Sequence, residues 1–267
     1  MEVTQILGYV GALVIGLVLG LTGGGGSILT VPILVYLLGI NPITATAYSL
    51  FVVGTSASFG AFKNFQKGLV DLKIAAVFAI PAFTMVYITR KYLIGAIPEV
   101  IFEFGGYAFT KDIAIMVLFA IMMVIASVTM LKPKSRDEEE ETKKRRLSNL
   151  LILNQAIVIG FFTGLVGAGG GFIIIPALIV LGNLSMKKAV GTSLFIISVN
   201  SLIGFIGDIG NINIDWVFLL SFTGLSVVGI LLGSFLSNNI EGDKLKRGFG
   251  WFVLVMGVYI LIKELVL

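Results

Sequence analysis

The stretch that decides the fold is Leu21-Thr22-Gly23-Gly24-Gly25-Gly26-Ser27-Ile28-Leu29-Thr30-Val31-Pro32. A second copy, Leu165-Val166-Gly167-Ala168-Gly169-Gly170-Gly171-Phe172-Ile173-Ile174-Ile175-Pro176, follows 144 residues later. Consecutive glycines interrupt a helix, because each costs about 1 kcal/mol relative to alanine. Each copy lies between strongly apolar segments, so irregular backbone interrupts apolar sequence twice. In a bilayer, such backbone persists only where protein buries it or where it lines an aqueous cavity.

The composition is that of a polytopic membrane protein. The chain is 57% hydrophobic and 13% charged, with a mean hydropathy of +1.03, whereas soluble domains are about 25% charged. It contains no cysteine and no histidine, which excludes disulfides, thiol catalysis and the commonest general base. We therefore expect no catalytic residues, no cofactor, no metal and no nucleic-acid partner. The net charge of +4 reports membrane topology instead.

We predict an all-α bundle of about ten membrane segments, each enclosed by polar or glycine-rich sequence. The N-terminus lacks a basic start and a cleavage site, so the first segment is expected to be retained. Residues 91–110 mix acidic residues and glycines with apolar ones, and we interpret them as an interfacial or extramembrane excursion. The predicted segments are 5–21, 28–39, 43–62, 72–90, 112–131, 149–166, 172–182, 187–206, 214–236 and 248–266.

The chain is predicted to be an internal duplication. Residues 1–131 form the first repeat, 132–148 a charged cytoplasmic linker, and 149–267 the second repeat. The two copies align without a gap from Gly16/Gly160 to Lys73/Val217, and the matches include glycine, proline, serine and acidic positions. Examples are Gly23/Gly167, Pro32/Pro176, Ser49/Ser193, Phe51/Phe195, Gly60/Gly204 and Asp71/Asp215.

The basic residues predict that the repeats are inverted. With the N-terminus outside, fifteen of the 19 lysines and arginines fall in cytoplasmic loops, and Arg90, Lys91, Lys111 and Lys263 fall outside. The equivalent loops 63–73 and 207–217 also differ, since the first carries three lysines and the second carries aspartates. The alternative is that segments two and seven are re-entrant and do not cross, which would make the repeats parallel.

The glycine loops are the candidate binding site. Paired glycine-interrupted segments in two halves indicate a transporter's binding site, and free N–H groups at helix N-termini attract anions. The spans offer neutral hydrogen-bond donors, so two converging loops would bind an anion without lysine or arginine in the membrane. The predicted substrate-binding residues are Gly23, Gly24, Gly25, Gly26, Ser27, Ser49, Gly167, Gly169, Gly170, Gly171, Thr192, Ser193 and Asn200.

Other residues have a structural explanation. Gly16, Gly20, Gly160 and Gly164 are expected to permit close helix packing, and scattered serines and threonines commonly bond to backbone carbonyls. Asp71 and Asp215 precede helices, where an acidic residue stabilises the N-terminus. No Gly-Lys-Ser/Thr ending follows either glycine run, which excludes a P-loop ATPase.

These motifs resemble the paired signature of the sulfite exporter TauE/SafE family. The resemblance covers nearly the whole chain, and the second copy continues it at Ala189-Val190-Gly191-Thr192-Ser193-Leu194-Phe195. It implies a plasma-membrane secondary transporter of small sulfur-containing anions such as sulfite or organosulfonates. The first copy has Tyr48 where the second has Thr192, which predicts an altered hydroxyl contact there.

Three other interpretations remain open at this point. They are a channel-like or cation-coupled permease, a structural membrane subunit, and an intramembrane enzyme, the last disfavoured by the missing histidine and cysteine. Besides the anion and the lipid bilayer, a second copy of the chain in a homodimer is the partner considered.

Overall fold

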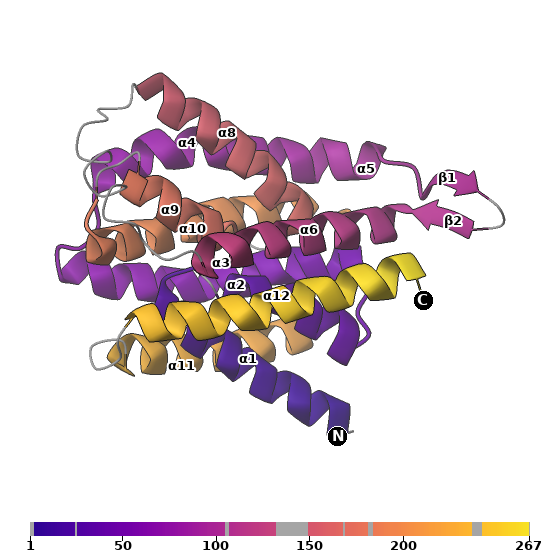
Figure 1. Ribbon diagram of the computed structural model, residues 1–267, viewed down its shortest axis with the longest axis horizontal. Helices are drawn as coiled ribbons and strands as arrows, with labels where there is room; N and C mark the ends of the chain where they lie inside the picture. Colours follow the sequence, from indigo (N-terminus) through magenta and orange to yellow (C-terminus); the bar gives the residue numbers. More distant parts are fainter. Residues whose placement is uncertain are drawn as a thin grey trace.

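The computed structural model describes residues 3–24, 26–104, 107–131, 149–167, 169–180, 184–236 and 242–266, and within them the chain is mostly helical (Figure 1). Each of the predicted segments corresponds to a helix. The first half contains α1 (Val3–Thr22), α2 (Ser27–Pro32) with the π-helical turn η1 (Ile33–Leu37), α3 (Pro42–Gln66), α4 (Leu72–Ile88) and α6 (Lys111–Leu131). The second half contains α8 (Asn149–Val166), α9 (Gly171–Val180), α10 (Met186–Asp208), α11 (Trp216–Leu236) and α12 (Gly242–Val266).

Six helical stretches in the described part of the chain are long and apolar enough to cross a membrane. They are Val3–Thr22, Pro42–Gln66, Leu72–Ala96, Lys111–Val128, Met186–Asp208 and Trp216–Leu236. The helices that follow the glycine loops are shorter, since α9 has 10 residues and α2 with η1 spans Ser27–Leu37. At 1.5 Å per residue each is about 15 Å long, half of a ~30 Å hydrocarbon core.

Residues 91–110, predicted to be an interfacial or extramembrane excursion, form a helical extension followed by a β-hairpin. Helix α4 continues beyond the predicted end at residue 90, through the π-helical turn η2 (Thr89–Leu93) and α5 (Ile94–Ala96). The antiparallel strands β1 (Val100–Phe104) and β2 (Tyr107–Thr110) then form a hairpin that projects beyond the helices (Figure 1). No strand was expected, so the all-α prediction holds for the described part of the chain except at this hairpin.

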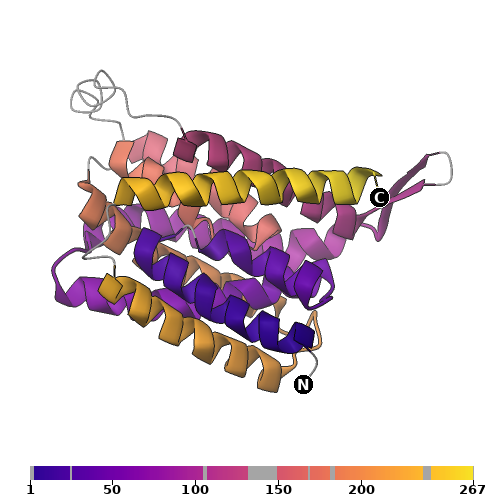
Figure 2. The same cartoon turned by 60° about the horizontal axis from the view of Figure 1, so that its bottom comes forward.

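The helices of the two halves exchange partners. Helix α1 lies against α11, and α8, its counterpart in the second half, lies against α4, the counterpart of α11. Helices α3 and α10 contact each other, as do α6 and α12, and α2 touches α9. Figures 1 and 2 show the chain ends and the hairpin at one end of the bundle, and α6 and α12 running in opposite directions.

The expected glycine packing is confirmed at both equivalent interfaces. A β-carbon on Gly16 would collide with the backbone of Ser226 in α11, and one on Gly160 would collide with the backbone of Ala82 in α4. Ala82 and Ser226 are themselves 144 residues apart. The structure therefore extends the register of the two copies through α4 and α11, beyond the segment in which the sequences match most clearly.

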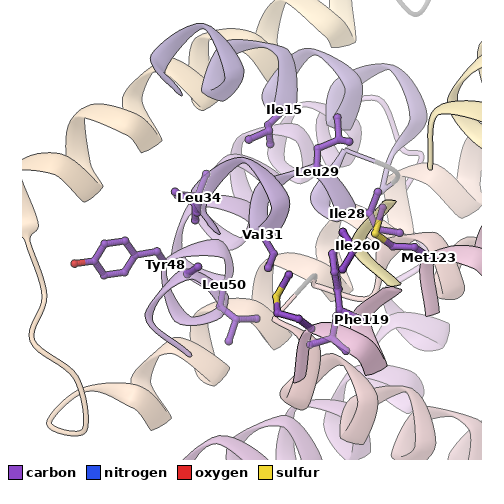
Figure 3. Close-up of a cluster of buried hydrophobic side chains, with 14 of the residues drawn as sticks. Ile15, Ile28, Leu29, Val31, Leu34, Tyr48, Leu50, Phe119, Met123 and Ile260 are labelled. Atoms are coloured by element: carbon purple, nitrogen blue, oxygen red, sulfur yellow. The ribbon is translucent and has the colours of Figure 1, made fainter. Parts of the chain in front are cut away.

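Apolar side chains enclose α2 on several sides. Figure 3 shows Ile28, Leu29, Val31 and Leu34 among buried side chains of neighbouring helices. The partners labelled there are Ile15, Tyr48, Leu50, Phe119, Met123 and Ile260. The backbone that precedes α2 is thus fixed inside the bundle, which positions the first glycine loop.

Candidate functional site

The two glycine loops meet inside the bundle. A β-carbon on Gly171 would lie 2.5 Å from Cα of Gly24, and one on Gly24 would lie 2.7 Å from the carbonyl carbon of Gly171. Both glycines are buried. Any side chain at either position would therefore separate the loops, because carbon atoms normally approach no closer than about 3.5 Å. Gly25, a predicted site residue, lies outside the described residues.

Each loop begins with a glycine that ends a helix in the same way. Gly23 and Gly167 have φ angles of +75° and +72°, and their N–H groups donate to the carbonyls of Leu19 and Thr163 at 2.8 and 2.9 Å. This left-handed conformation is the usual glycine termination of an α-helix. The second loop contains two further positive-φ residues, Gly169 and Gly170.

Ser193 fixes the first loop to α10. Its Oγ lies 2.8 Å from the carbonyl oxygen of Gly23 and 2.9 Å from that of Val190. Ser27 also bonds to this loop, since its Oγ donates to the Gly24 carbonyl at 2.7 Å. These two predicted site residues hold the glycine loop in place.

Thr192 and Tyr48 make the same contact in the two halves. The hydroxyl oxygen of Thr192 accepts the Asp71 N–H at 3.0 Å, and that of Tyr48 accepts the Asp215 N–H at 2.7 Å. The longer tyrosine side chain therefore preserves the contact that the sequence difference placed in doubt. The hydroxyl of Thr192, in α10, thus contacts the start of α4.

Asp71 and Asp215 cap the helices that follow them. Their Oδ1 atoms accept the N–H groups of Ile74 and Phe218, each at 3.1 Å. The structural explanation of these aspartates is confirmed, because such side-chain bonds satisfy the free donors of a helix's first turn.

Several buried polar groups around the second loop have no hydrogen-bond partner among the described residues. Ser201 Oγ lies 3.0 Å from the position that a β-carbon on Gly169 would occupy, and Thr163 Oγ1 lies beside Gly170. Two predicted site residues, Ser49 and Asn200, are buried with their polar atoms unpartnered as well. Buried polar groups are normally satisfied, so the unpartnered groups beside the second loop are candidate ligand contacts, and this region is the candidate binding centre.

Arg90 is a charged residue of this centre that the sequence analysis missed. It is only 1% exposed, and its Nη2 lies 2.7 Å from the position of a β-carbon on Gly167. Its Nη1 donates to Thr46 Oγ1 at 3.0 Å and lies 3.3 Å from Oδ2 of Asp208, which is 3% exposed. Contrary to the expectation of glycine loops without a neighbouring arginine, a buried arginine therefore lies beside the second loop.

The burial of Arg90 and Asp208 could not be predicted from their places in the sequence. Arg90 and Lys91 end an apolar segment, where basic residues usually mark the membrane surface. The helix instead continues to Ala96 and turns Arg90 inward while Lys91 stays exposed. Asp208 was assigned to a loop, but α10 extends to include it. An ionisable residue inside a segment is a functional hypothesis by default, and the uninterrupted helix is what places Arg90 there.

The donors at this centre suit an anion. Arg90 Nη2 and the hydroxyls of Thr163 and Ser201 lie beside the second loop. Helices α3 and α10 add the Ser49 hydroxyl and the Asn200 amide, which are buried without a partner among the described residues. In the described part of the chain, no group of three or more acidic residues could hold a metal ion. Neutral and cationic donors without a carboxylate cluster favour an oxyanion ligand.

A model of the family described as "Sulfite exporter TauE/SafE" matches residues 9–260. The chain belongs to the sulfite exporter TauE/SafE family. It is therefore a multi-pass membrane transporter by family and by its apolar helices.

Curated relatives of the chain are described as probable membrane transporters. A "Probable membrane transporter protein" of Xylella fastidiosa (strain 9a5c) is 28% identical over 251 residues, covering 92% of this chain and 91% of the relative. "Probable membrane transporter protein YunE" of Bacillus subtilis is 25% identical over 261 residues, with 88% and 90% covered. A Haemophilus influenzae relative of the same description is 25% identical, with 95% and 96% covered. No solved structure shows significant similarity to the chain.

Proposed function

We propose that the protein is a secondary transporter, in the export direction, of small sulfur-containing anions such as sulfite or organosulfonates. The observation that carries the proposal is the contact between Gly24 and Gly171 inside the bundle, beside buried polar groups without partners. Substrate binding at a junction between repeats is the usual arrangement in secondary transporters. The family membership supports transport, and the donor chemistry supports an anion.

Helix α9 adds to the attraction for an anion. It begins at Gly171, in the loop itself, and runs for 10 residues. A helix N-terminus carries a partial positive charge. Glycine at this position lets an oxyanion approach the backbone closely.

We propose that the two halves, 1–131 and 149–267, are inverted repeats that rock around this centre. The exchanged helix partners support a two-fold relationship between them. The opposite directions of α6 and α12 support inversion (Figure 1). Alternating access would then open the loop contact to each side of the membrane in turn.

The proposed location is the plasma membrane, with the N-terminus outside and the linker 132–148 in the cytoplasm. The chain has no cysteine, so a single introduced cysteine reports one position. An impermeant maleimide added to intact cells should label Glu103→Cys in the hairpin and spare Lys67→Cys after α3. The reverse labelling pattern would contradict this orientation.

Thermal stability of the purified protein against a panel of anions and cations tests the proposed function. A ligand that binds the native state stabilises it by about 2.7 kcal/mol at a hundredfold excess over its Kd. Sulfite or a sulfonate should raise the apparent Tm, whereas chloride and matched cations should not. A response to cations alone would favour a cation-coupled permease, and no response to any ion would favour a structural subunit.

Variants of the second loop connect the response to the site. Gly169→Val should abolish anion stabilisation, because Gly169 has a φ of +64° and a β-carbon there meets Val53 and Ser201. Ser201→Ala removes an unpartnered hydroxyl without adding volume, so it should fold normally and respond less to the anion. Thr84→Ala, at an exposed position in α4, is the matched control.

A further inference from the structure

We infer that Arg90 is the residue that binds the charge of the anion, through the Nε–Nη2 edge of its guanidinium group, and that Asp208 competes with the anion for Arg90. The inference deepens the proposed function and rests on it, since it assigns the charged contact within the same centre.

The Arg90 side chain extends from η2 and contacts α3, α10 and the second glycine loop. It belongs to η2, and its guanidinium contacts Thr46 of α3 and Asp208 of α10. The neighbouring Gly207 is so close that a β-carbon there would lie 3.1 Å from Cβ of Arg90. On the remaining side, Nη2 faces Gly167, the first residue of the second loop. The cation is thus held against the glycine loop by helices of both halves.

The nitrogen atoms of the Arg90 guanidinium group differ in their hydrogen bonding. Nη1 contacts both Thr46 and Asp208, whereas Nε and Nη2 are buried and have no partner among the described residues. Nε–H and one Nη2–H point in parallel along one edge of the planar group. This edge binds two oxygens of the same carboxylate, phosphate or sulfur oxyanion. A buried, unoccupied edge of this shape selects an oxyanion over a spherical halide.

Asp208 neutralises Arg90 through a weak contact. Between these two side chains, one ion-pair contact is found in the described structure, 3.3 Å from Nη1 of Arg90 to Oδ2 of Asp208. Oδ2 of Asp208 accepts no hydrogen bond from the described residues. A strongly held carboxylate would use both oxygens on the Arg90 fork. The Asp208 carboxylate therefore offsets the buried charge of Arg90, and an anion can displace it from the guanidinium group. Because both negative groups interact with one cation, the anion and Asp208 compete.

The charged pair, formed by Arg90 of the first half and Asp208 of the second, has no charged equivalent at the corresponding positions of the other copy. At the positions 144 residues away, Ser234 corresponds to Arg90 and Asn64 corresponds to Asp208. Asn64 Nδ2 donates to the carbonyl of Gly60 at 2.8 Å. The duplicated fold therefore contains one charged anion contact and not two. Binding of one anion per chain follows from this asymmetry.

The experiment is anion titration of the full-length protein in detergent by isothermal calorimetry and thermal shift. The probes are sulfite, methanesulfonate and chloride, and the variants are Arg90→Gln, Arg90→Lys and Asp208→Asn. Lys91→Gln is the matched control, because Lys91 is the neighbouring cation but is exposed. The double variant Arg90→Gln/Asp208→Asn keeps the site neutral, so it separates loss of binding from loss of folding.

Wild type should bind one sulfite or sulfonate per chain. Arg90→Gln and the double variant should weaken binding by at least a hundredfold, and Lys91→Gln should leave it unchanged. Arg90→Lys should keep a charge but lose the planar edge, so its preference for sulfonate over chloride should fall at least tenfold. Asp208→Asn should bind at least tenfold more tightly, and its low stability without anion should recover when sulfite is added.

Distinct results would overturn each step. If wild type binds sulfite and the double variant binds it within twofold, Arg90 is not the anion contact, and the proposed function stands without it. Weaker binding by Asp208→Asn, or a variant that cannot be recovered with or without sulfite, would overturn the competition. If wild type binds none of the anions, the proposed function itself fails together with this inference.

Discussion

Replacing Gly171 by alanine should push the two glycine loops apart. The new β-carbon would lie 2.5 Å from Cα of Gly24, 2.7 Å from its carbonyl oxygen and 2.7 Å from Cδ1 of Ile197. Normal carbon contacts are about 3.5–4.0 Å, so the facing atoms must move by about 1 Å. Ile197 can rotate away, but the Gly24 backbone is held by the Ser27 hydroxyl.

Such overpacking costs about 1–3 kcal/mol. For a chain of this size, 1 kcal/mol corresponds to roughly 2–4 °C in Tm. A cost of about 2 kcal/mol should therefore lower the apparent Tm in detergent by roughly 4–8 °C. Gly224→Ala in α11 is the control, because no atom lies within 4 Å of its added β-carbon, and alanine is the better helix former by about 1 kcal/mol.

The double variant Gly24→Ala/Gly171→Ala tests the contact itself. A β-carbon at either position meets the backbone of the other, so a single separation of the loops accommodates both. The double variant should therefore be destabilised by less than the sum of the single variants, by roughly 0.5–3 kcal/mol. Strict additivity, or a Tm of Gly171→Ala equal to that of the Gly224→Ala control, would refute the argument that the loops touch.

Three further predictions follow from the contacts of the loops and helix ends. Ser193→Ala should lower the free energy of unfolding by about 1–3 kcal/mol, because it leaves the buried Gly23 carbonyl without its hydroxyl partner. Thermal unfolding measures the change, and an effect no larger than that of Thr84→Ala would contradict this role. Tyr48→Phe should cost about 1 kcal/mol in the same assay, since it removes the acceptor of the Asp215 N–H and keeps the ring against Phe218; an unchanged Tm would mean that water replaces the hydroxyl. Gly16→Val should prevent close approach of α1 and α11, with loss of monodisperse protein on size exclusion, whereas Gly224→Val should be recovered normally.

The pairing of Arg90 with Asp208 explains why the sequence predicts a site without charged residues. A charged side chain at the centre of a membrane helix costs about 2.5–3.5 kcal/mol on insertion scales. Asp208 offsets part of this cost, yet the two residues are far apart in the chain and each stands at the end of an apolar segment. Neither position alone indicates burial. Only their contact makes a buried charge at the glycine loop tolerable.

The membrane class and the approximate positions of the helices could be predicted from the sequence, and the duplication remains a prediction from the match between the two copies. These features depend on local physics, namely apolar length, glycine and proline breaks, and a match between copies at a fixed offset. For the same reason the sequence indicated that Asp71 and Asp215 begin helices and that Gly16 and Gly160 permit close packing. The convergence of the loops was a prediction from the inverted repeat, and the placement of Gly24 against Gly171 agrees with it.

Tertiary structure alone decided which polar groups lie unpartnered at the centre. Ser49 and Ser193 are equivalent in sequence, but Ser193 donates to the Gly23 carbonyl, while the Ser49 hydroxyl has no partner among the described residues. The same asymmetry separates Arg90 and Asp208 from their neutral counterparts. Two copies of one pattern give the same helices, because helix formation depends on nearby residues. They give different sites, because each side chain's partners come from the other copy, and those partners differ.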